Sequence, residues 1–272
     1  MFINNINPVL FSIGPFGVRY YGLVYFIGFI IGYIVLRHAI KHKRLGLTVD
    51  QLDTYYLWLM IGSIVMARLF DVFIYNLPEY INNLSDAFKI WNGGLSIQGG
   101  LVGAIIVTII LCKKYKVHFY DIADVAIIPT AFTMFLGKLA NYTNSELYGT
   151  ITNVQATPWC VVFQKVDTYC RHPAQIYEAI AILLTFGILL GYYIYYLKNK
   201  KSHWKGTTFW LFMLLYGLLR FFITFLRDEP LYLGLNVGQW LSIIMIIIAG
   251  IFLWRIWKPL GNHGRQNPKV YK

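Results

Sequence analysis

The chain has 272 residues, of which 57% are hydrophobic and only 13% are charged, and its formal net charge is +12. A soluble domain of this size carries roughly 25% charged and about 45–50% apolar residues, so the composition excludes an ordinary soluble protein and indicates an integral membrane protein. No basic patch with base-stacking aromatic residues stands apart from the apolar segments, which excludes nucleic acid as the reason for the positive charge.

Seven apolar segments are each long enough to cross a bilayer core of roughly 30 Å. Their length and continuity favour a helical bundle over the tilted strands of a membrane barrel. We therefore predict an all-α, polytopic membrane protein with seven transmembrane helices, forming a single domain over residues 1–272. The predicted spans are 20–37, 54–76, 95–112, 121–140, 173–197, 206–226 and 237–257, with outer loops at 77–93 and 142–172.

Basic residues are concentrated in alternate connections between these spans, and the positive-inside rule places such connections in the cytoplasm. The N-terminus is then predicted outside and the C-terminus inside. Met1–Val18 carries no charge and lacks the basic start of a cleavable signal peptide. The basic groups are Arg37, Lys41, Lys43 and Arg44; Lys113, Lys114 and Lys116; Lys198, Lys200, Lys201 and Lys205; and Arg255, Lys258, Arg265, Lys269 and Lys272.

Two of the three cysteines fall in one predicted outer loop, where they raise the question of a disulfide. Cys112 falls at the cytoplasmic end of the third span, whereas Cys160 and Cys170 share the outer loop 142–172. That side is oxidising, so a Cys160–Cys170 disulfide and two free thiols are both open. The histidines include no zinc-binding pattern, and we predict no metal site.

The second and third spans contain polar and small residues that need an explanation. Arg68 and Asp71 are three residues apart on one helical face, which predicts an internal ion pair. In the stretch GGLSIQGGLVGA (93–104), Gln98 is the only strongly polar side chain. Gly99 and Gly103 form a GxxxG motif, and Gly100 belongs to a second stripe of small residues. Such stripes indicate close helix packing or room for a lipid, and both remain open.

Polar residues also cluster where the fourth span ends and the fifth begins. GKLANYTNSELYG (137–149) brings Lys138, Asn141 and Glu146 close together. A lysine that reaches toward the membrane surface would explain Lys138 alone, but not the amides and hydroxyls that follow it. RHPAQIYE (171–178) places Gln175 and Glu178 three residues apart on one helical face, directed into the bundle or capping it.

The sixth span predicts an anion site. Arg220, Thr224 and Arg227 follow one another at helical spacing and are expected to share one face. Two guanidiniums on one stripe repel each other unless an anion is present, and a planar guanidinium is suited to hold phosphate. With Lys138 and Arg19, the outer side gathers cations that face few carboxylates, so we predict a phospholipid headgroup as the ligand.

Taken together, the motifs resemble those of the prolipoprotein diacylglyceryl transferase family, in order and along nearly the whole chain. One such motif would be weak, but seven in order form a specific signal. They are RYYGLVY (19–25), GGLSIQGGLVG (93–103), GKLANYTNSELYG (137–149), PWCVVF (158–163), RHPAQIYE (171–178), RFFITFLRDEP (220–230) and VGQWLS (237–242).

The resemblance implies an enzyme of a prokaryotic cell (inner) membrane with its active site toward the outer leaflet. Such an enzyme transfers the diacylglyceryl group of phosphatidylglycerol to the thiol of the lipobox cysteine of a prolipoprotein signal peptide and releases glycerol 1-phosphate. It implies no metal or other cofactor and no nucleic acid. The alternatives are a catalytically altered or inactive relative that binds lipid or prolipoprotein and, from another class, an anion transporter.

The resemblance also assigns roles to individual residues. Phosphatidylglycerol would be bound by Lys138, which stands where the family has an arginine, and by the deep Arg220. The remaining expected lipid-binding residues are Gly99, Gly100, Gly149 and His172, and the expected catalytic residues are Tyr21, Gln98, Asn141, Glu146 and Arg227.

Three positions depart from the family pattern. Gln98 stands in place of a histidine, Lys138 in place of an arginine, and Thr224 in place of a glutamate. An amide is no general base at ordinary pH. The proton of the attacking thiol would therefore go to Glu146, His172, Tyr21 or solvent, and the sequence leaves these four open.

Overall fold

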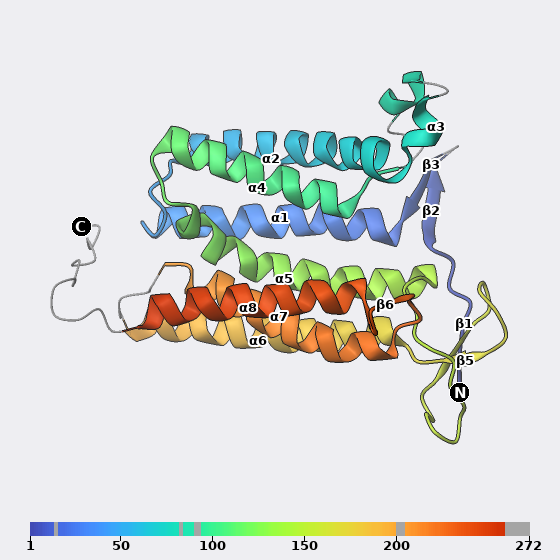
Figure 1. Cartoon of the computed structure of the whole chain (residues 1–272). Helices are drawn as coiled ribbons and strands as arrows, with labels where there is room; N and C mark the ends of the chain where they lie inside the picture. Colours follow the sequence, from blue (N-terminus) through green and yellow to red (C-terminus); the bar gives the residue numbers. More distant parts are fainter. Residues whose placement is uncertain (14–15, 82–83, 90–93, 200–204, 259–272) are drawn as a thin grey trace. The chain divides into compact units, whose positions relative to one another are not determined.

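The computed structural model describes residues 1–13, 16–81, 84–89, 94–199 and 205–258 (Figure 1). Within them, seven helices are long and apolar enough to cross a membrane, which confirms the predicted polytopic architecture. Gly93, Lys200, Lys201, Arg265, Lys269 and Lys272 lie outside the described residues. The long helices are α1 (Tyr20–Lys41), α2 (Val49–Phe70), α4 (Ile97–Tyr115), α5 (Phe119–Asn144), α6 (Ala174–Asn199), α7 (Thr207–Ile223) and α8 (Val237–Trp257).

Short elements that the all-α prediction missed lie before α1 and between the long helices. They are too short, at two to five residues, to give a hydrophobic period. The strands are β1 (Phe2–Asn4), β2 (Val9–Ile13), β3 (Phe16–Arg19), β4 (Val161–Phe163), β5 (Cys170–Arg171), β6 (Leu231–Tyr232) and β7 (Leu235–Asn236), and the short helices are η1 (Asp71–Tyr75), α3 (Leu77–Ile81), η2 (Leu84–Phe88) and η4 (Thr224–Leu226).

The chain packs as two compact units, each described by itself. The first unit comprises Met1–Val35 and Ala123–Lys272, and the second comprises Leu36–Ile122. A single domain over 1–272 stays a prediction.

The second unit is built on the close packing of α2 against α4. A Cβ atom at Gly99 would collide with the main-chain oxygen of Met66, and one at Gly103 with that of Gly62. Small residues at these positions let the two backbones approach each other. The packing interpretation of the GxxxG motif is therefore confirmed.

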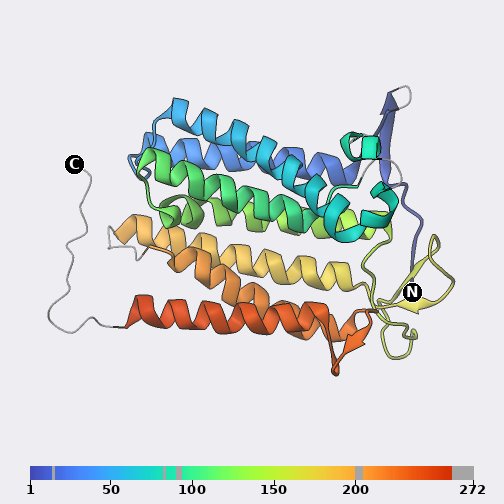
Figure 2. The ribbon, with the colours of Figure 1, turned by 45° about the horizontal axis from the view of Figure 1, so that its top comes forward.

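In the first unit, α5, α6, α7 and α8 lie side by side (Figures 1 and 2). Their core contains Ile128, Ala131, Leu189 and Phe212, all buried. Large apolar side chains elsewhere on these helices are exposed, and Leu184 is 59% exposed. Apolar surface on this scale is what a helix presents to lipid.

Strands gather at one end of the first unit, where α5 and α7 end and α6 and α8 begin (Figure 1). β1 pairs in parallel with β4, which pairs in antiparallel fashion with β5. Single bridges extend this ladder from Arg171 to Ile151 and from Gly149 to Arg227. We call residues 1–4, 149–151, 160–163, 170–171 and 227 the strand cap.

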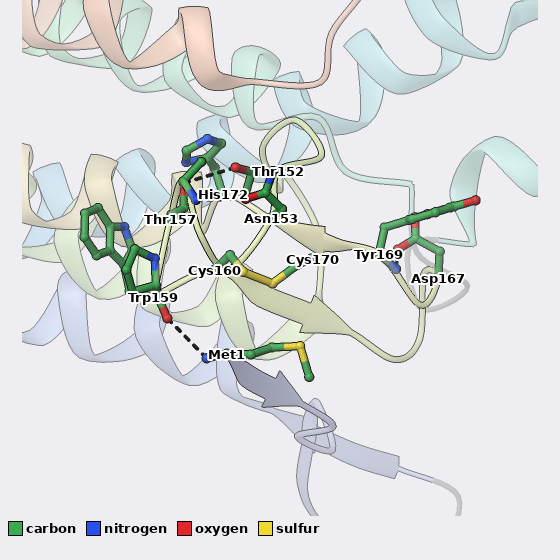
Figure 3. The surroundings of a disulfide bond; sticks show 12 residues. Met1, Thr152, Asn153, Thr157, Trp159, Cys160, Asp167, Tyr169, Cys170 and His172 are labelled. Atoms are coloured by element: carbon green, nitrogen blue, oxygen red, sulfur yellow. Dashed lines mark hydrogen bonds between the residues drawn. A yellow bond between two sulfur atoms is a disulfide. The ribbon is translucent and has the colours of Figure 1, made fainter.

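The structure answers the question that the cysteines left open. Cys160, directly before β4, and Cys170 of β5 form a disulfide (Figure 3). Beside it, the main-chain nitrogen of Phe2 donates to the oxygen of Cys160 at 3.0 Å. The disulfide thus lies inside the strand cap, whereas Cys112 is a buried free thiol.

Candidate functional site

A buried carboxylate, Glu178 on α6, joins two of the predicted cations. Its side chain is 4% exposed and forms ion pairs with Lys138 of α5 and Arg227, the latter at 3.2 Å. Nη2 of Arg227 forms a further ion pair with Oε1 of Glu229 at 2.5 Å. The prediction of cations that face few carboxylates is therefore wrong for Lys138 and Arg227, because each has an acidic partner.

Arg220 lies next to this ion-pair network on α7. Its Nη1 donates to the hydroxyl of Tyr216 at 2.7 Å. Arg220 and Glu178 line the same small cavity of about 10 Å³, together with Thr185. A cavity of this size holds about one water. We call Lys138, Glu178, Arg220, Arg227 and Glu229 the charged cluster; it contains three cations and two carboxylates.

The backbone conformation that places Arg227 in the charged cluster differs from the helix that the sequence predicts. Helix α7 ends at Ile223, the 3₁₀ turn η4 follows, and Arg227 is extended, with φ −88° and ψ 141°. The predicted single helical face through Arg227 is therefore wrong. Thr224 instead caps its own helix, with its hydroxyl donating to the oxygen of Arg220.

Nε of Arg227 and Oε1 of Gln175 are buried polar atoms of this region without a hydrogen-bond partner among the described residues. A buried polar atom without a partner costs about 1–3 kcal/mol, so each such atom in a native protein calls for a reason. One such reason is that a ligand supplies the missing hydrogen bond when it binds. This reason fits Nε of Arg227, which is a donor within the charged cluster.

Glu146 is held at the surface by the amides around it. Nδ2 of Asn141 donates to its Oε1 at 2.6 Å and Nδ2 of Asn144 at 3.1 Å. Its main-chain oxygen accepts a hydrogen bond from Gln175 at 2.6 Å. Ser145, immediately before Glu146, has φ 58°, so the turn is strained. The buried Asn141 thus orients an exposed carboxylate.

Tyr21 lies in the first turn of α1, where its hydroxyl is hydrogen-bonded to that of Tyr25. The hydroxyl of Tyr25 donates to that of Tyr21 at 3.1 Å. Tyr25 is within electrostatic range of the Glu146 carboxylate. The structure therefore brings Tyr21, Asn141 and Glu146 to one region of the first unit.

Gly149 has a packing reason to be glycine. A Cβ atom there would lie 2.5 Å from the main-chain oxygen of Leu226 and 2.7 Å from that of His172. Contacts under 3.0 Å with main-chain atoms leave no room for a side chain. The residue expected to bind lipid thus lies at a junction of the strand cap.

His172 is the first residue after the strand cap and lies just before α6. Its Nδ1 is 3.2 Å from the hydroxyl of Tyr177, which accepts a hydrogen bond from Nε1 of Trp159 at 2.7 Å. Burial lowers the pKa of His172 below its usual value, which favours the neutral ring. Its imidazole is therefore tied into a small aromatic network.

Gln98 belongs to the second unit, where it lies in the first turn of α4. Its side chain is exposed, and its Oε1 accepts a hydrogen bond from the Ser96 hydroxyl at 3.0 Å. The same hydroxyl caps the helix by accepting from the nitrogen of Gly99. A Cβ atom at Gly100 would make only ordinary van der Waals contacts, the nearest at 3.7 Å to the main-chain oxygen of Ser63.

The predicted Arg68–Asp71 ion pair is confirmed, with a separation of 3.4 Å. Arg68 also donates to the main-chain oxygens of Ala87 and Gly94, at 2.8 and 2.9 Å. Asp71 accepts from the hydroxyl of Tyr80 at 2.9 Å. The pair therefore anchors the connection between α2 and α4.

The sequence places Glu178 on one helical face with Gln175 but gives it no role, whereas the structure places it between Lys138 and Arg227 in the charged cluster. Its signal was its position in RHPAQIYE, seven residues after Arg171.

Seven membrane-spanning helices with a buried charged cluster at one end of the first unit define a multi-pass membrane protein with a polar site. The sequence profile of the family described as prolipoprotein diacylglyceryl transferase matches residues 8–255. The chain therefore belongs to the prolipoprotein diacylglyceryl transferase family, which is a family of transferases.

Two bacterial relatives illustrate the extent of the similarity, and both are named phosphatidylglycerol–prolipoprotein diacylglyceryl transferase. The protein of Rickettsia canadensis (strain McKiel) is 36% identical over 254 residues, which cover 92% of this chain and 96% of the relative. The protein of Rhizobium leguminosarum bv. trifolii (strain WSM2304) is 33% identical over 263 residues, covering 94% and 92%.

Proposed function

We propose that this protein transfers the diacylglyceryl group of phosphatidylglycerol to the lipobox cysteine of prolipoproteins, the first step of lipoprotein lipidation. Family membership supports the reaction, and the charged cluster supports it from the structure. The observation that carries the proposal is the excess of cations around one buried carboxylate: Lys138, Arg220 and Arg227 near Glu178.

In this reaction, the cysteine sulfur attacks the carbon of the diacylglyceryl group that carries the phosphate. A carbon–sulfur bond forms, the carbon–oxygen bond to phosphate breaks, and glycerol 1-phosphate leaves with the bonding electrons. The thiol proton goes to a base, because the thiolate is the nucleophile. The atoms balance with the lipid and the thiol alone.

The proposed role of the charged cluster is to hold the phosphate as it leaves. Guanidiniums form paired hydrogen bonds with phosphate, and cations aimed at a leaving group stabilise the transition state. Glu178 keeps Lys138 and Arg227 in place without substrate. The unpartnered Nε of Arg227 supports this role because it is a buried donor on the same side chain.

We propose Glu146 as the acceptor of the thiol proton. Its carboxylate is exposed, is oriented by Asn141 and Asn144, and acts electrostatically on Tyr25, which is bonded to Tyr21. His172 is less suited, because its Nδ1 already faces the hydroxyl of Tyr177.

We further propose that the protein lies in a prokaryotic cell membrane with the strand cap outside. Two observations support this orientation. The disulfide lies in the strand cap, and disulfides persist in oxidising compartments. Arg255 lies in the last turn of α8 and Lys258 directly follows this helix, at the end opposite the strand cap, as the positive-inside rule requires of a cytoplasmic end (Figure 1).

The test is reconstitution of the purified full chain with labelled phosphatidylglycerol and a lipobox peptide. We expect thioether-linked lipid on the peptide and an equal amount of glycerol 1-phosphate. Binding of both substrates without transfer, under conditions where a relative is active, would establish the inactive alternative and reject the proposal. Phosphate flux across sealed vesicles without peptide would support a transporter instead.

A further inference from the structure

Arg171 is a buried cation outside the membrane-spanning helices that the proposed reaction does not use. It is the second residue of β5, between Cys170 of the disulfide and His172. Its side chain is only 8% exposed. Burying a guanidinium is costly unless it is fully bonded, so its partners indicate its role.

The guanidinium of Arg171 contacts three separate segments of the first unit. Nε and Nη2 donate to Asp167 at 3.0 and 2.6 Å. Nη1 donates to Asp228 at 2.9 Å and to the main-chain oxygen of Gly149 at 3.3 Å. Its central carbon also lies 4.7 Å from the centre of the Tyr148 ring.

These partners show that Arg171 is not a second phosphate ligand. One guanidinium faces two carboxylates, Asp167 and Asp228, so the group as a whole is anionic. Its hydrogen bonds to Asp167 raise the pKa of Arg171 and lower that of Asp167, which keeps both groups charged. The positive charge is thereby compensated within the protein.

The main chain is fixed on both sides of Arg227, and Arg171 holds one of these sides. Asp228 follows Arg227 directly and is held by Arg171. On the other side, the nitrogen of Thr150 donates to the oxygen of Leu226 at 2.9 Å. Gly149, whose oxygen Arg171 binds, is the bridge partner of Arg227.

We propose that Arg171 is a positioning residue for the transfer reaction. It ties Gly149 and Asp228 to β5 and so holds the Arg227 guanidinium at Glu178, without contacting substrate itself. The inference rests on the proposed function for its effect on turnover. Its structural half, the tie between β5 and the segments of Gly149 and Arg227, is independent of activity.

The experiment compares three variants of the full-length protein. Arg171→Gln removes the tie, and Asp228→Asn weakens one contact while the bonds to Asp167 remain. Lys165→Gln is the matched control, because Lys165 is an exposed cation of the same loop that bonds only the main chain of Ile6. For each we measure kcat, the KM for phosphatidylglycerol, and hydrogen exchange at the amides of Gly149 and Thr150.

We expect Arg171→Gln to lower kcat roughly 10- to 100-fold, the effect of misplacing a catalytic group by about 1 Å. KM should change less than about twofold, and exchange at Gly149 and Thr150 should accelerate while α6 and α7 stay protected. Asp228→Asn should show a smaller loss of the same kind, and Lys165→Gln should match the wild type.

The two proposals fail in different ways. If the wild type transfers no lipid, the proposed function fails, whereas hydrogen exchange still tests the tie. Unchanged exchange at Gly149 and Thr150 in Arg171→Gln overturns the positioning role whatever the turnover. A loss that appears only in KM also overturns it, because it would mean that Arg171 acts on substrate binding.

Discussion

The two units each bury an ion pair near a helix end, and the two pairs differ in what else the cation bonds. In the second unit, Arg68 pairs with Asp71 and gives further hydrogen bonds to main-chain oxygens, including that of Gly94. In the first unit, Glu178 lies between cations from different elements, and Arg227 keeps an unpartnered Nε. The comparison indicates that an arginine bonded to main-chain oxygens stabilises the structure. Cations that share one carboxylate are instead suited to exchange that carboxylate for a ligand.

The largest expected effect separates the two arginines directly. Arg227→Ala should lower kcat/KM by about 1,000-fold or more, because a donor to the leaving phosphate is lost. Arg68→Ala should instead lower the free energy of unfolding by about 3–5 kcal/mol, since it leaves the Asp71 carboxylate buried and unpaired. Transfer assays and chemical unfolding of both variants measure the difference. Equal losses of activity at equal stability would remove the distinction.

Glu178→Gln should sharpen the comparison, with Asp71→Asn as its counterpart. Without the carboxylate, Lys138 and Arg227 lose their internal anion, so phosphate should bind the charged cluster more tightly. We expect a roughly tenfold gain in affinity for inorganic phosphate, about 1.4 kcal/mol, together with a lower kcat. Titration calorimetry measures the affinity. Asp71→Asn should leave phosphate affinity unchanged, and a gain there would contradict the assignment.

Gln98 tests whether the second unit contributes to the reaction at all. If its position requires a proton acceptor, Gln98→His should raise the transfer rate about three- to tenfold near neutral pH, a modest part of the roughly 100-fold or greater effect of a well-placed base. Gln98→Ala should lower the rate, because the exposed amide is lost. Initial rates of peptide lipidation decide this. If neither substitution changes the rate, Gln98 serves only the start of α4.

The smallest expected effect concerns the pH dependence of stability through His172. Burial lowers its pKa below the usual histidine value of about 6.5, so around that pH the unfolded chain binds a proton that the folded chain does not. Its unfavourable contribution is absent well above pH 6.5 and grows as the pH falls through that value. The melting temperature should therefore fall on acidification, and less so in His172→Gln. A steeper fall in that variant would contradict the sign.

The sequence predicted the number and order of the spans because a stretch of about 20 apolar residues has few other uses. It also predicted the Arg68–Asp71 pair, since the partners are three residues apart in one helix. The partnership of Glu178 with Lys138 and Arg227 joins positions 40 and 49 residues apart, and helical periodicity says which way a side chain points but not what it meets.

The end of α7 shows the same limit at short range. Arg220 and Thr224 have helical spacing, and the extrapolation to Arg227 fails because the chain becomes extended to pair with Gly149. That pairing depends on a segment 78 residues earlier, which no local propensity reports. The disulfide was left open for a related reason, since spacing does not show whether β4 and β5 bring Cys160 and Cys170 together.

The parallel pairing of β1 with β4 has a consequence for biosynthesis. Residues 2–4 are synthesised well before their partners at 161–163, which follow only after more than 150 further residues. During translation, β1 therefore remains unpaired while four of the seven helices enter the membrane. The disulfide closes only later still, once Cys170 has been made, so completion of the strand cap marks a late stage in the maturation of the protein.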